Sequence, residues 1–435
     1  MRLPISKRFS LISVLAVCVP LAACSGPSGS GAEETVSVTK RELNVGGIVK
    51  MRTETRTTEI GAAPLPQPQR PHLGNLTAGD YDDVLNPEFY AQYAGAVIQQ
   101  TRAELPFVDT RTRVAVKVVD GVGRPVPQAR IEVARQGGAL LLISGADGIA
   151  SFYPRFDHIA SGAQISVASQ AGSIGRKLQL SGRGEQTVTL KVSGLARPVS
   201  ALDLVLVLDA TGSMSDEMNY LQSELGSIIA RVRSDAGNVD LRIGLIVYRD
   251  DGDVYVTRSF PLSGDIGAMR EALGQQDADG GGDTPEAVDR AMIAAEKMQW
   301  RSGATKTLLL VADAPPHEEA LKSTLDATER LRAQGVRIVP VAASGVEDSA
   351  QYVMRTMAVL TQGRYIFLTD DSGIGNAHAE PTVACYVVTR LDQLIARVLA
   401  SIVSGRRVEP DQGEIIRTVG SYNAGRCSKT KVAMR

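Results

Sequence analysis

Five oxygen-bearing side chains of this 435-residue sequence follow apolar or glycine-rich segments at spacings that suit a hard metal cation. They belong to Asp209, Thr211, Ser213, Thr284 and Asp313. The first three follow the apolar run 202–208, the fourth follows the glycines at 280–282, and the last follows the run 307–312. Such runs predict buried parallel strands, and open α/β sheets bind ligands at the carboxyl ends of their strands. Carboxylate and hydroxyl oxygens suit Mg²⁺ best, with Ca²⁺ or Mn²⁺ as alternatives, and do not suit zinc or copper.

Three of these residues also have a purely structural interpretation. Thr284 precedes Pro285, a residue favoured at the first helical position, so its hydroxyl is a candidate cap for a helix that continues through Met298. Asp209 is a candidate cap for the next helix, and Asp313 is a candidate solvated turn residue. The joint occurrence of these oxygens at the ends of three segments favours the metal site over three independent structural roles.

The elements that must position these residues begin near residue 200, where strand and helix patterns alternate. The expected strands are 202–208, 243–248, 307–312, 336–341 and 365–368, with an antiparallel edge strand at 254–260. Apolar residues at helical spacing from Met218 to Val232 predict a core-facing helix, and residues 391–403 predict a last helix that closes the domain near Gly405. The expected fold class is α/β, with a doubly wound, mostly parallel sheet covered on both faces.

The sequence Asp209-x-Thr211-x-Ser213, followed by Thr284 and Asp313, resembles the metal-ion-dependent adhesion site of von Willebrand factor type A domains. The resemblance covers residues 200–404, close to half of the chain. The segments Gly-Gly-Gly-Asp-Thr-Pro-Glu and Ala-Asp-Ala-Pro-Pro-His are most similar to the hemicentin-type branch of that family.

The resemblance implies a Rossmann-like domain in which hydroxyls contact the metal and the aspartates act mostly through water. Such a site is short of negative charge and keeps one coordination position open, which an Asp or Glu of a protein partner fills. The implied function is metal-dependent protein binding without catalysis. An envelope scaffold whose metal only stabilises the fold is the main alternative.

A metal-dependent hydrolase is a weaker alternative. A phosphatase of the haloacid dehalogenase type also has a nucleophilic Asp after its first strand, but it requires a carboxylate two residues later, where this chain has Thr211. Ser213 lacks the Gly-x-Ser-x-Gly sequence of a hydrolase nucleophile. We therefore expect that the protein is not an enzyme.

The chain is too long for one hydrophobic core, so further domains are expected. Residues 111–194 contain short alternating strands separated by turn residues, which predicts a small all-β sandwich before the α/β domain. The segments 123–129 and 146–152 resemble carboxypeptidase-regulatory-like and transthyretin-like sandwiches. Residues 75–110 are expected to form a short helical connecting segment, and residues 405–435 a C-terminal tail.

The N-terminus has the pattern of an export signal. Residues 1–23 combine early positive charges with an apolar stretch, and Leu21-Ala22-Ala23-Cys24 resembles a bacterial lipoprotein cleavage site with Cys24 as the lipidated residue. The alternative is an ordinary secretory signal. Ser25 resembles the residue that directs lipoproteins to the outer membrane, and residues 24–74 are rich in Gly, Pro, Ser and Thr, which predicts a flexible tether.

Charge and cysteine content restrict the partners and the compartment. Removal of the signal changes the formal charge from −1 to −4 and leaves no basic cluster, so nucleic acid is not an expected partner. No later apolar stretch reaches the ~20 residues that a membrane-spanning helix requires. We expect a cell-envelope protein attached to the membrane only through its lipid. Cys385 and Cys427 are one possible disulfide pair, with two free thiols as the alternative.

Three further clusters carry polar residues. Asp80, Asp82 and Asp83 lack the glycine and distal glutamate of a calcium loop, so we expect a solvated turn. Residues 248–253 are expected to form a solvated hairpin turn, which is favoured over an extension of the metal site. His317 is expected to be a surface residue at a helix start rather than a group at the rim of the site, and His158 a surface histidine.

Overall fold

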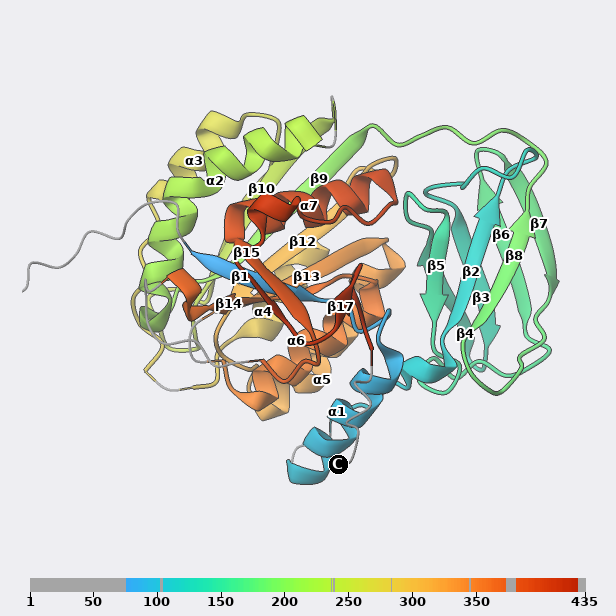
Figure 1. Ribbon diagram of the computed structural model, residues 1–435, viewed down its shortest axis with the longest axis horizontal. Coiled ribbons are helices and arrows are strands. Elements are labelled where there is room, and N and C mark those ends of the chain that lie inside the picture. Colours follow the sequence, from blue (N-terminus) through green and yellow to red (C-terminus); the bar gives the residue numbers. More distant parts are fainter. Residues whose placement is uncertain are drawn as a thin grey trace, which may run out of the picture. The chain divides into compact units, whose positions relative to one another are not determined.

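The computed structural model describes residues 76–101, 105–235, 237, 239–282, 284–343, 346–372 and 381–428, all within one compact unit (Figure 1). The expected signal at 1–23, the tether at 24–74 and the candidate lipidation site Cys24 lie outside the described residues. None of the described helices has both the length and the apolar character that are needed to cross a membrane.

A nine-stranded sheet forms the centre of the α/β domain, in the order β11-β10-β9-β12-β13-β14-β1-β15-β16. Five strands lie parallel to one another: β10 (Asp240–Tyr248), β9 (Ala201–Asp209), β12 (Thr305–Ala312), β13 (Val336–Ala342) and β14 (Tyr365–Thr369). These strands are buried along almost their whole length because helices cover both faces, as the continuous apolar runs predicted. The expected fold class is therefore confirmed.

The helices divide into two layers, one on each face of the sheet (Figure 1). One layer contains α2 (Ser215–Asp235), α3 (Ile266–Gly274) and α7 (Leu391–Ser404). The other contains α4 (Val288–Glu296), α5 (Leu321–Ala333) and α6 (Asp348–Thr361). The apolar stripe of α2 is buried against the sheet, so its predicted role in the core is confirmed.

The edge strand β11 (Thr257–Ser263) is antiparallel to β10, as expected, but it begins three residues later than predicted. Residues 249–256 form a loop instead, closed by the hydrogen bond from the Arg249 N–H to the Val256 carbonyl at 3.0 Å. Val254 lies in this loop and is 85% exposed. Its apolar character suggested a strand, but tertiary contacts of the loop decide its conformation.

The segment 75–110 is more than a connector. It contains the predicted helix, α1 (Pro87–Gln100), but it also contributes β1 (Thr77–Tyr81) to the central sheet. β1 lies between β14 and β15 (Tyr386–Arg390) and is antiparallel to both. This strand is hard to predict from local sequence because Gly79 and Asp80 are poor strand formers and its partner β14 lies almost 300 residues away.

The acidic residues of this segment do not form a solvated turn, so that expectation was wrong. Asp83 is buried and forms an ion pair with Arg355 on α6, with Oδ1 and Nη2 2.6 Å apart. Asp80 is also buried, and its Oδ2 accepts hydrogen bonds from Arg364 at 3.3 Å and Arg407 at 3.2 Å. Arginines that are distant in sequence supply the compensating charge, which permits this burial.

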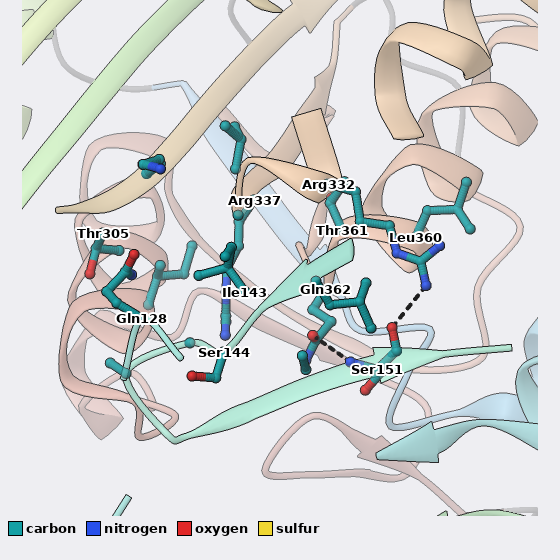
Figure 2. Close-up of a pocket in the computed structure, with 18 residues that line it drawn as sticks. Gln128, Ile143, Ser144, Ser151, Thr305, Arg332, Arg337, Leu360, Thr361 and Gln362 are labelled. Carbon is teal, nitrogen blue, oxygen red and sulfur yellow. Dashed lines mark hydrogen bonds between the residues drawn. The ribbon is translucent and has the colours of Figure 1, made fainter. Parts of the chain in front are cut away.

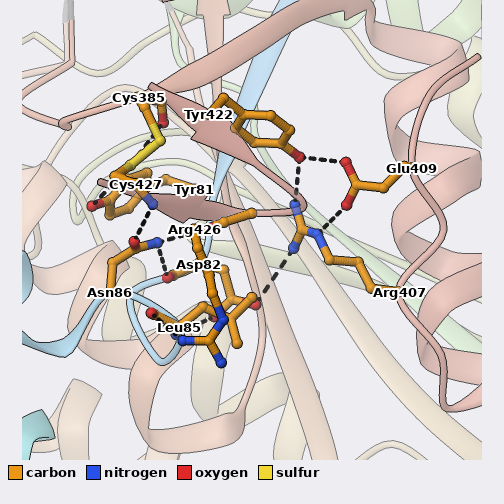
Figure 3. Close-up of a disulfide and its surroundings, with 11 residues drawn as sticks. Tyr81, Asp82, Leu85, Asn86, Cys385, Arg407, Glu409, Tyr422, Arg426 and Cys427 are labelled. Carbon is orange, nitrogen blue, oxygen red and sulfur yellow. Dashed lines mark hydrogen bonds and ion pairs between the residues drawn. A yellow bond between two sulfur atoms is a disulfide. The ribbon is translucent and has the colours of Figure 1, made fainter. Parts of the chain in front are cut away.

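The tail is also part of the domain. Its strand β16 (Arg417–Val419) pairs with β15, and β17 (Tyr422–Asn423) pairs with β18 (Arg426–Cys427). Figure 3 shows the disulfide between Cys385 and Cys427, whose Cα atoms are 5.5 Å apart. Beside it, the Asn86 side chain donates to the Gly425 carbonyl at 2.7 Å and accepts from the Cys427 N–H at 2.8 Å. The tail therefore binds Asn86, which follows β1 in the sequence.

The β-sandwich consists of two sheets, β5-β2-β8 and β4-β3-β6-β7. Its strands are β2 (Val114–Val119), β3 (Arg130–Arg135), β4 (Gly138–Ile143), β5 (Ile149–Phe152), β6 (Gln164–Ser169), β7 (Gly172–Lys177) and β8 (Gln186–Lys191). The sequence pattern predicts six of these strands, at 114–119, 129–134, 140–143, 149–153, 164–168 and 187–192, each within two residues of the observed bounds. The edge strand β7 was not predicted, because it contains two glycines and is largely exposed. His158 is exposed, as expected.

Hydrogen bonds join the sandwich to the α/β domain around a small pocket (Figure 2). The Ser151 N–H donates to Oε1 of Gln362 at 3.0 Å, and Arg332 donates to the Ser151 carbonyl at 2.8 Å. Arg332 also forms a buried ion pair with Asp157, at 2.7 Å. These hydrogen bonds and this ion pair are specific polar contacts between the sandwich and the α/β domain.

Candidate metal centre

The loop after β9 brings three of the predicted site residues together. Asp209 is 1% exposed, and its Oδ1 accepts from the Thr211 hydroxyl at 2.7 Å and from the Thr211 N–H at 3.0 Å. The hydroxyl oxygens of Thr211 and Ser213 are 3.4 Å apart. The strand ends at Asp209 and the helix α2 starts at Ser215, so all three side chains occupy the turn between them.

The second predicted carboxylate joins the same cluster. Asp313 directly follows β12, the neighbour of β9, and the Ser213 hydroxyl hydrogen-bonds to it. Burial raises the pKa of Asp209 to about 7, and the charge of Asp313 adds to the rise, although the Thr211 hydrogen bonds oppose it. Burial also raises the pKa of Asp313. Two adjacent carboxyl groups thus lack a compensating positive charge, which a divalent cation would supply.

Thr284 is not brought into this cluster by any hydrogen bond within the described ranges, and its side chain is exposed. The alternative role of Thr284 as a helix cap is wrong. The helix α4 begins at Val288 rather than at Pro285, and its N-cap residue is Ala287. The segment before α4 instead lies along the loop after β12, where the Glu286 N–H donates to the Pro315 carbonyl at 3.0 Å.

Glu286 is a buried residue of this region that the sequence analysis did not select. It is 4% exposed, and no described residue forms a hydrogen bond with its Oε2 atom. Burial and the charges of Asp209, Asp250 and Asp313 raise its pKa to about 9. The sequence does contain an indication of this residue, because a carboxylate follows Thr284 by two residues in the motif that ends in Pro285-Glu286.

The loop 249–256 joins the antiparallel strands β10 and β11 and has an exposed tip at Asp251 and Gly252, as expected for a hairpin turn, but other residues of the loop pack against the site. Arg249 is 6% exposed and donates to the carbonyls of Ala210 at 3.0 Å and Asp277 at 2.9 Å. Asp253 accepts from the Gly281 N–H at 3.0 Å. These contacts connect the loop to the segment that carries Asp209 and to the glycine-rich segment, although Asp251 itself is exposed.

His317 is not simply a surface residue at a helix start. It caps the short helix at Glu318–Ala320, as expected, but its Nε2 lies 2.7 Å from Oδ1 of Asp250. This contact joins the loop after β12 to the loop 249–256. His317 is therefore a rim residue of the cluster, the alternative that the sequence analysis had placed second.

The chemistry of the donor set fits a hydrated divalent cation. Among the residues that the structure describes, Oδ2 of Asp209 and Oε2 of Glu286 are both buried without a hydrogen-bond partner, which is costly unless a cation or water satisfies them. Within the described ranges, no three His, Cys, Asp or Glu side chains are arranged to hold a metal ion by themselves. Hydroxyl oxygens and water would therefore complete the coordination.

Comparisons with known proteins concern the α/β part of the chain. Residues 203–378 match the model of the von Willebrand factor type A domain. A segment of 132 residues is 29% identical to alpha-protein kinase vwkA of Dictyostelium discoideum, and covers 30% of this chain and 21% of that protein. The chain thus spans about a fifth of the length of this curated relative.

Among solved structures, the chain is similar to the pilus adhesin SpaC from Lactobacillus rhamnosus GG in its open conformation. The identity is 12% and the TM-score 0.34, over 56% of this chain and 31% of the adhesin. It is also similar to BatB from Bacteroides thetaiotaomicron, with 14% identity and a TM-score of 0.26, over 49% of this chain and 92% of BatB.

Proposed function

We propose, from the von Willebrand factor type A domain at residues 203–378, that this protein binds a protein partner through a divalent cation held at the carboxyl edge of its sheet. The observation that carries the proposal is the cluster of Asp209, Thr211 and Ser213 at the end of β9, with Asp313 at the end of the neighbouring strand β12. Mg²⁺ is the preferred ion, with Ca²⁺ or Mn²⁺ as alternatives, because all the available ligands are oxygen atoms.

The chemistry of this function is recognition. The two hydroxyls and the two aspartates hold the hydrated cation, and an Asp or Glu of the partner replaces one of its waters. Binding rather than hydrolysis is supported by Thr211, which stands where a phosphatase of the alternative type would need a second carboxylate.

Titration calorimetry of the full chain with Mg²⁺ and Mn²⁺ tests the metal site. Asp209→Ala and Ser213→Ala should each remove most of the binding while circular dichroism stays unchanged, since the apolar core holds the sheet. Ser227→Ala, an exposed serine on α2 far from the strand ends, is the control. Unchanged metal affinity in both site variants would contradict the proposal.

Capture experiments distinguish partner binding from a scaffold role. The purified chain should retain a protein from an envelope fraction in Mg²⁺ and release it in EDTA, and Asp209→Ala should not capture it. A metal that stabilises the fold without changing capture would favour the scaffold alternative.

We also propose that the protein is exported and anchored in the cell envelope through lipid on Cys24, with the tether 24–74 between the lipid and the folded part. Two or three acyl chains anchor a protein firmly, whereas a single chain is marginal. Cys24→Ser should leave the protein uncleaved or move it out of the membrane fraction. An unchanged distribution between fractions would exclude a lipoprotein, and an outer-membrane location is tested by separating the two membranes.

A further inference from the structure

Two residues of the segment before α4 differ in their burial. Thr284 is exposed, whereas Glu286 is 4% exposed. A glutamate is rarely buried to this extent without a paired charge. The reason for its burial lies in the contacts of its backbone and its side chain.

The backbone of Glu286 is fixed to the loop that carries Asp313. Its N–H donates to the Pro315 carbonyl at 3.0 Å, and Glu286 and Pro316 form a parallel β-bridge. Asp313 lies only two residues before Pro315. The two segments therefore place the Glu286 side chain and Asp313 in the same region at the carboxyl edge of the sheet.

The side chain of Glu286 extends toward the loop after β9. A Cβ atom added at Gly281 would lie 2.8 Å from Oε1 of Glu286 and 2.9 Å from Cβ of Thr211. Glu286 and Thr211 thus both occupy the space beside Gly281 where a side chain would lie, and Gly281 has a φ of 83°. Only glycine fits this position well, because another residue would have both a strained backbone and two close contacts.

The strongest charge effects on Glu286 come from carboxylates. They belong to Asp209, Asp250, Asp313 and Asp253. Its Oε2 atom has no hydrogen-bond partner within the described ranges. Arg249, the buried cation of the region, instead donates to the carbonyls of Ala210 and Asp277. A buried carboxyl group in this situation needs a positive charge from outside the protein.

We infer that Glu286 is a third carboxyl group of the metal centre, beside Asp209 and Asp313, and that it acts on the hydrated cation through water. This inference rests on the proposed function. It changes one property of the site, because a third carboxyl group lets the protein hold the cation firmly without a partner carboxylate. Removal of a group that orients a metal's ligands or waters typically lowers metal affinity by about 10- to 100-fold.

The test is titration of the full chain with Mn²⁺, following the free ion by electron paramagnetic resonance, in the absence of any partner. Glu286→Gln keeps the shape of the side chain and removes its charge, and should weaken Mn²⁺ binding by about 10- to 100-fold. Thr284→Ala should weaken it by less than about threefold. Asp289→Asn is the matched control, since Asp289 is a buried carboxylate in the first turn of α4 that pairs with Arg290, and it should leave the affinity unchanged.

Circular dichroism and thermal unfolding in EDTA show whether each variant is folded. If Glu286→Gln does not fold, Glu286→Asp retains the charge on a shorter side chain and should bind Mn²⁺ more weakly than the wild type. Wild-type affinity in a folded Glu286→Gln, or in Glu286→Asp where the glutamine variant does not fold, would overturn the inference.

The same titration separates this inference from the proposed function. One outcome is that the wild type and Glu286→Gln bind Mn²⁺ equally well, whereas Asp209→Asn does not bind it. The metal centre is then supported, and the proposed role of Glu286 is wrong. If the wild type itself binds no Mn²⁺, both the metal centre and the inference fail.

Discussion

Buried charged side chains of this protein are stabilised by ion-pair partners that are distant in the sequence. Asp83 and Arg355 are 2% and 1% exposed at their side chains and form two hydrogen bonds, at 3.0 Å and 2.6 Å. The guanidinium also lies 3.8 Å from the ring centre of Tyr93. Burial alone would lower the pKa of Arg355, but the charge and hydrogen bonds of Asp83 raise it above its ordinary value.

Removal of one member of this pair should therefore destabilise the protein strongly. Arg355→Met leaves Asp83 buried and uncompensated, and we expect a loss of about 3–5 kcal/mol in the free energy of unfolding. Urea unfolding measures it, with Arg330→Met as the control because Arg330 is half exposed and pairs with Glu296 at the surface. The double variant with Asp83→Leu should recover much of the loss, and equal losses in the single and double variants would contradict this explanation.

Asp120 in the β-sandwich should make the stability of the protein depend on pH in the acid range. Burial would raise its pKa, but hydrogen bonds from the N–H groups of Ala196, Arg124 and Val122 hold the pKa below its usual value. A folded pKa below the unfolded one means that Asp120 stabilises the protein above pH 4. This contribution is lost as the pH falls further.

Asp120→Asn should consequently reduce stability at pH 7 and flatten its decline between pH 5 and pH 2. Thermal unfolding across this range is the measurement, with the exposed Glu185→Gln as the control. If the stability of the variant declines as steeply as that of the wild type, other carboxylates determine the loss of stability at acid pH.

At the scale of elements, β1 is the unexpected component of the sheet. It lies between β14 and β15, and a Cβ atom at Gly79 would lie 2.7 Å from Cζ of Phe367 and 2.9 Å from Cδ2 of Tyr386. These two rings are in edge-to-face contact, with centroids 4.9 Å apart. The absence of a side chain at Gly79 makes room for them.

Gly79→Ala should thus weaken the attachment of β1 rather than improve its strand propensity. We expect a loss of about 1–3 kcal/mol from overpacking. Hydrogen exchange should be faster at 77–81 than in the wild type, while the amides of β9 and β12 stay protected. The control Gly95→Ala has no atom within 4 Å of the new Cβ, and it should be neutral or stabilising on the exposed face of α1. A stabilised Gly79→Ala variant would contradict the packing argument.

At the scale of the whole molecule, the tail and the N-terminal strand hold each other in place. Arg407 of the tail bonds to Asp80 at 3.2 Å and lies 3.5 Å from Asp82, while Asn86 binds the backbone of Gly425 and Cys427. The disulfide joins this tail to Cys385, which immediately precedes β15 (Figure 3).

Loss of the disulfide should destabilise the protein by about 4 kcal/mol on the chain-entropy account, since the bridged cysteines are 42 residues apart. Urea unfolding of the double variant Cys385→Ala with Cys427→Ala should show this loss. Its amide hydrogens at residues 80–86 should exchange faster than those of the wild type. The wild type in reducing agent is the matched comparison. No change in either measurement, or free thiols in the native protein, would contradict the prediction.

The sequence alone determined the doubly wound sheet, six strands of the sandwich and the positions of Asp209, Thr211, Ser213 and Asp313. These features depend on local patterns: long apolar runs predict buried strands, and the residue after a strand must lie at the carboxyl edge of the sheet. A parallel neighbour then brings two such residues together, as β12 and β9 bring Asp313 to Ser213.

Only the tertiary structure decided the roles of Glu286, Asp83 and β1. Whether Thr284 or Glu286 is buried depends on the bridge between Glu286 and Pro316, which joins segments 30 residues apart. Asp83 looks solvated in its own segment, and only Arg355 makes its burial possible. β1 contains glycine and aspartate, and it forms a strand because two strands from the far end of the chain supply its hydrogen bonds and the space for Gly79. Ion pairs and strand pairing between distant segments leave no periodic pattern in the sequence. They are therefore visible only in the folded structure.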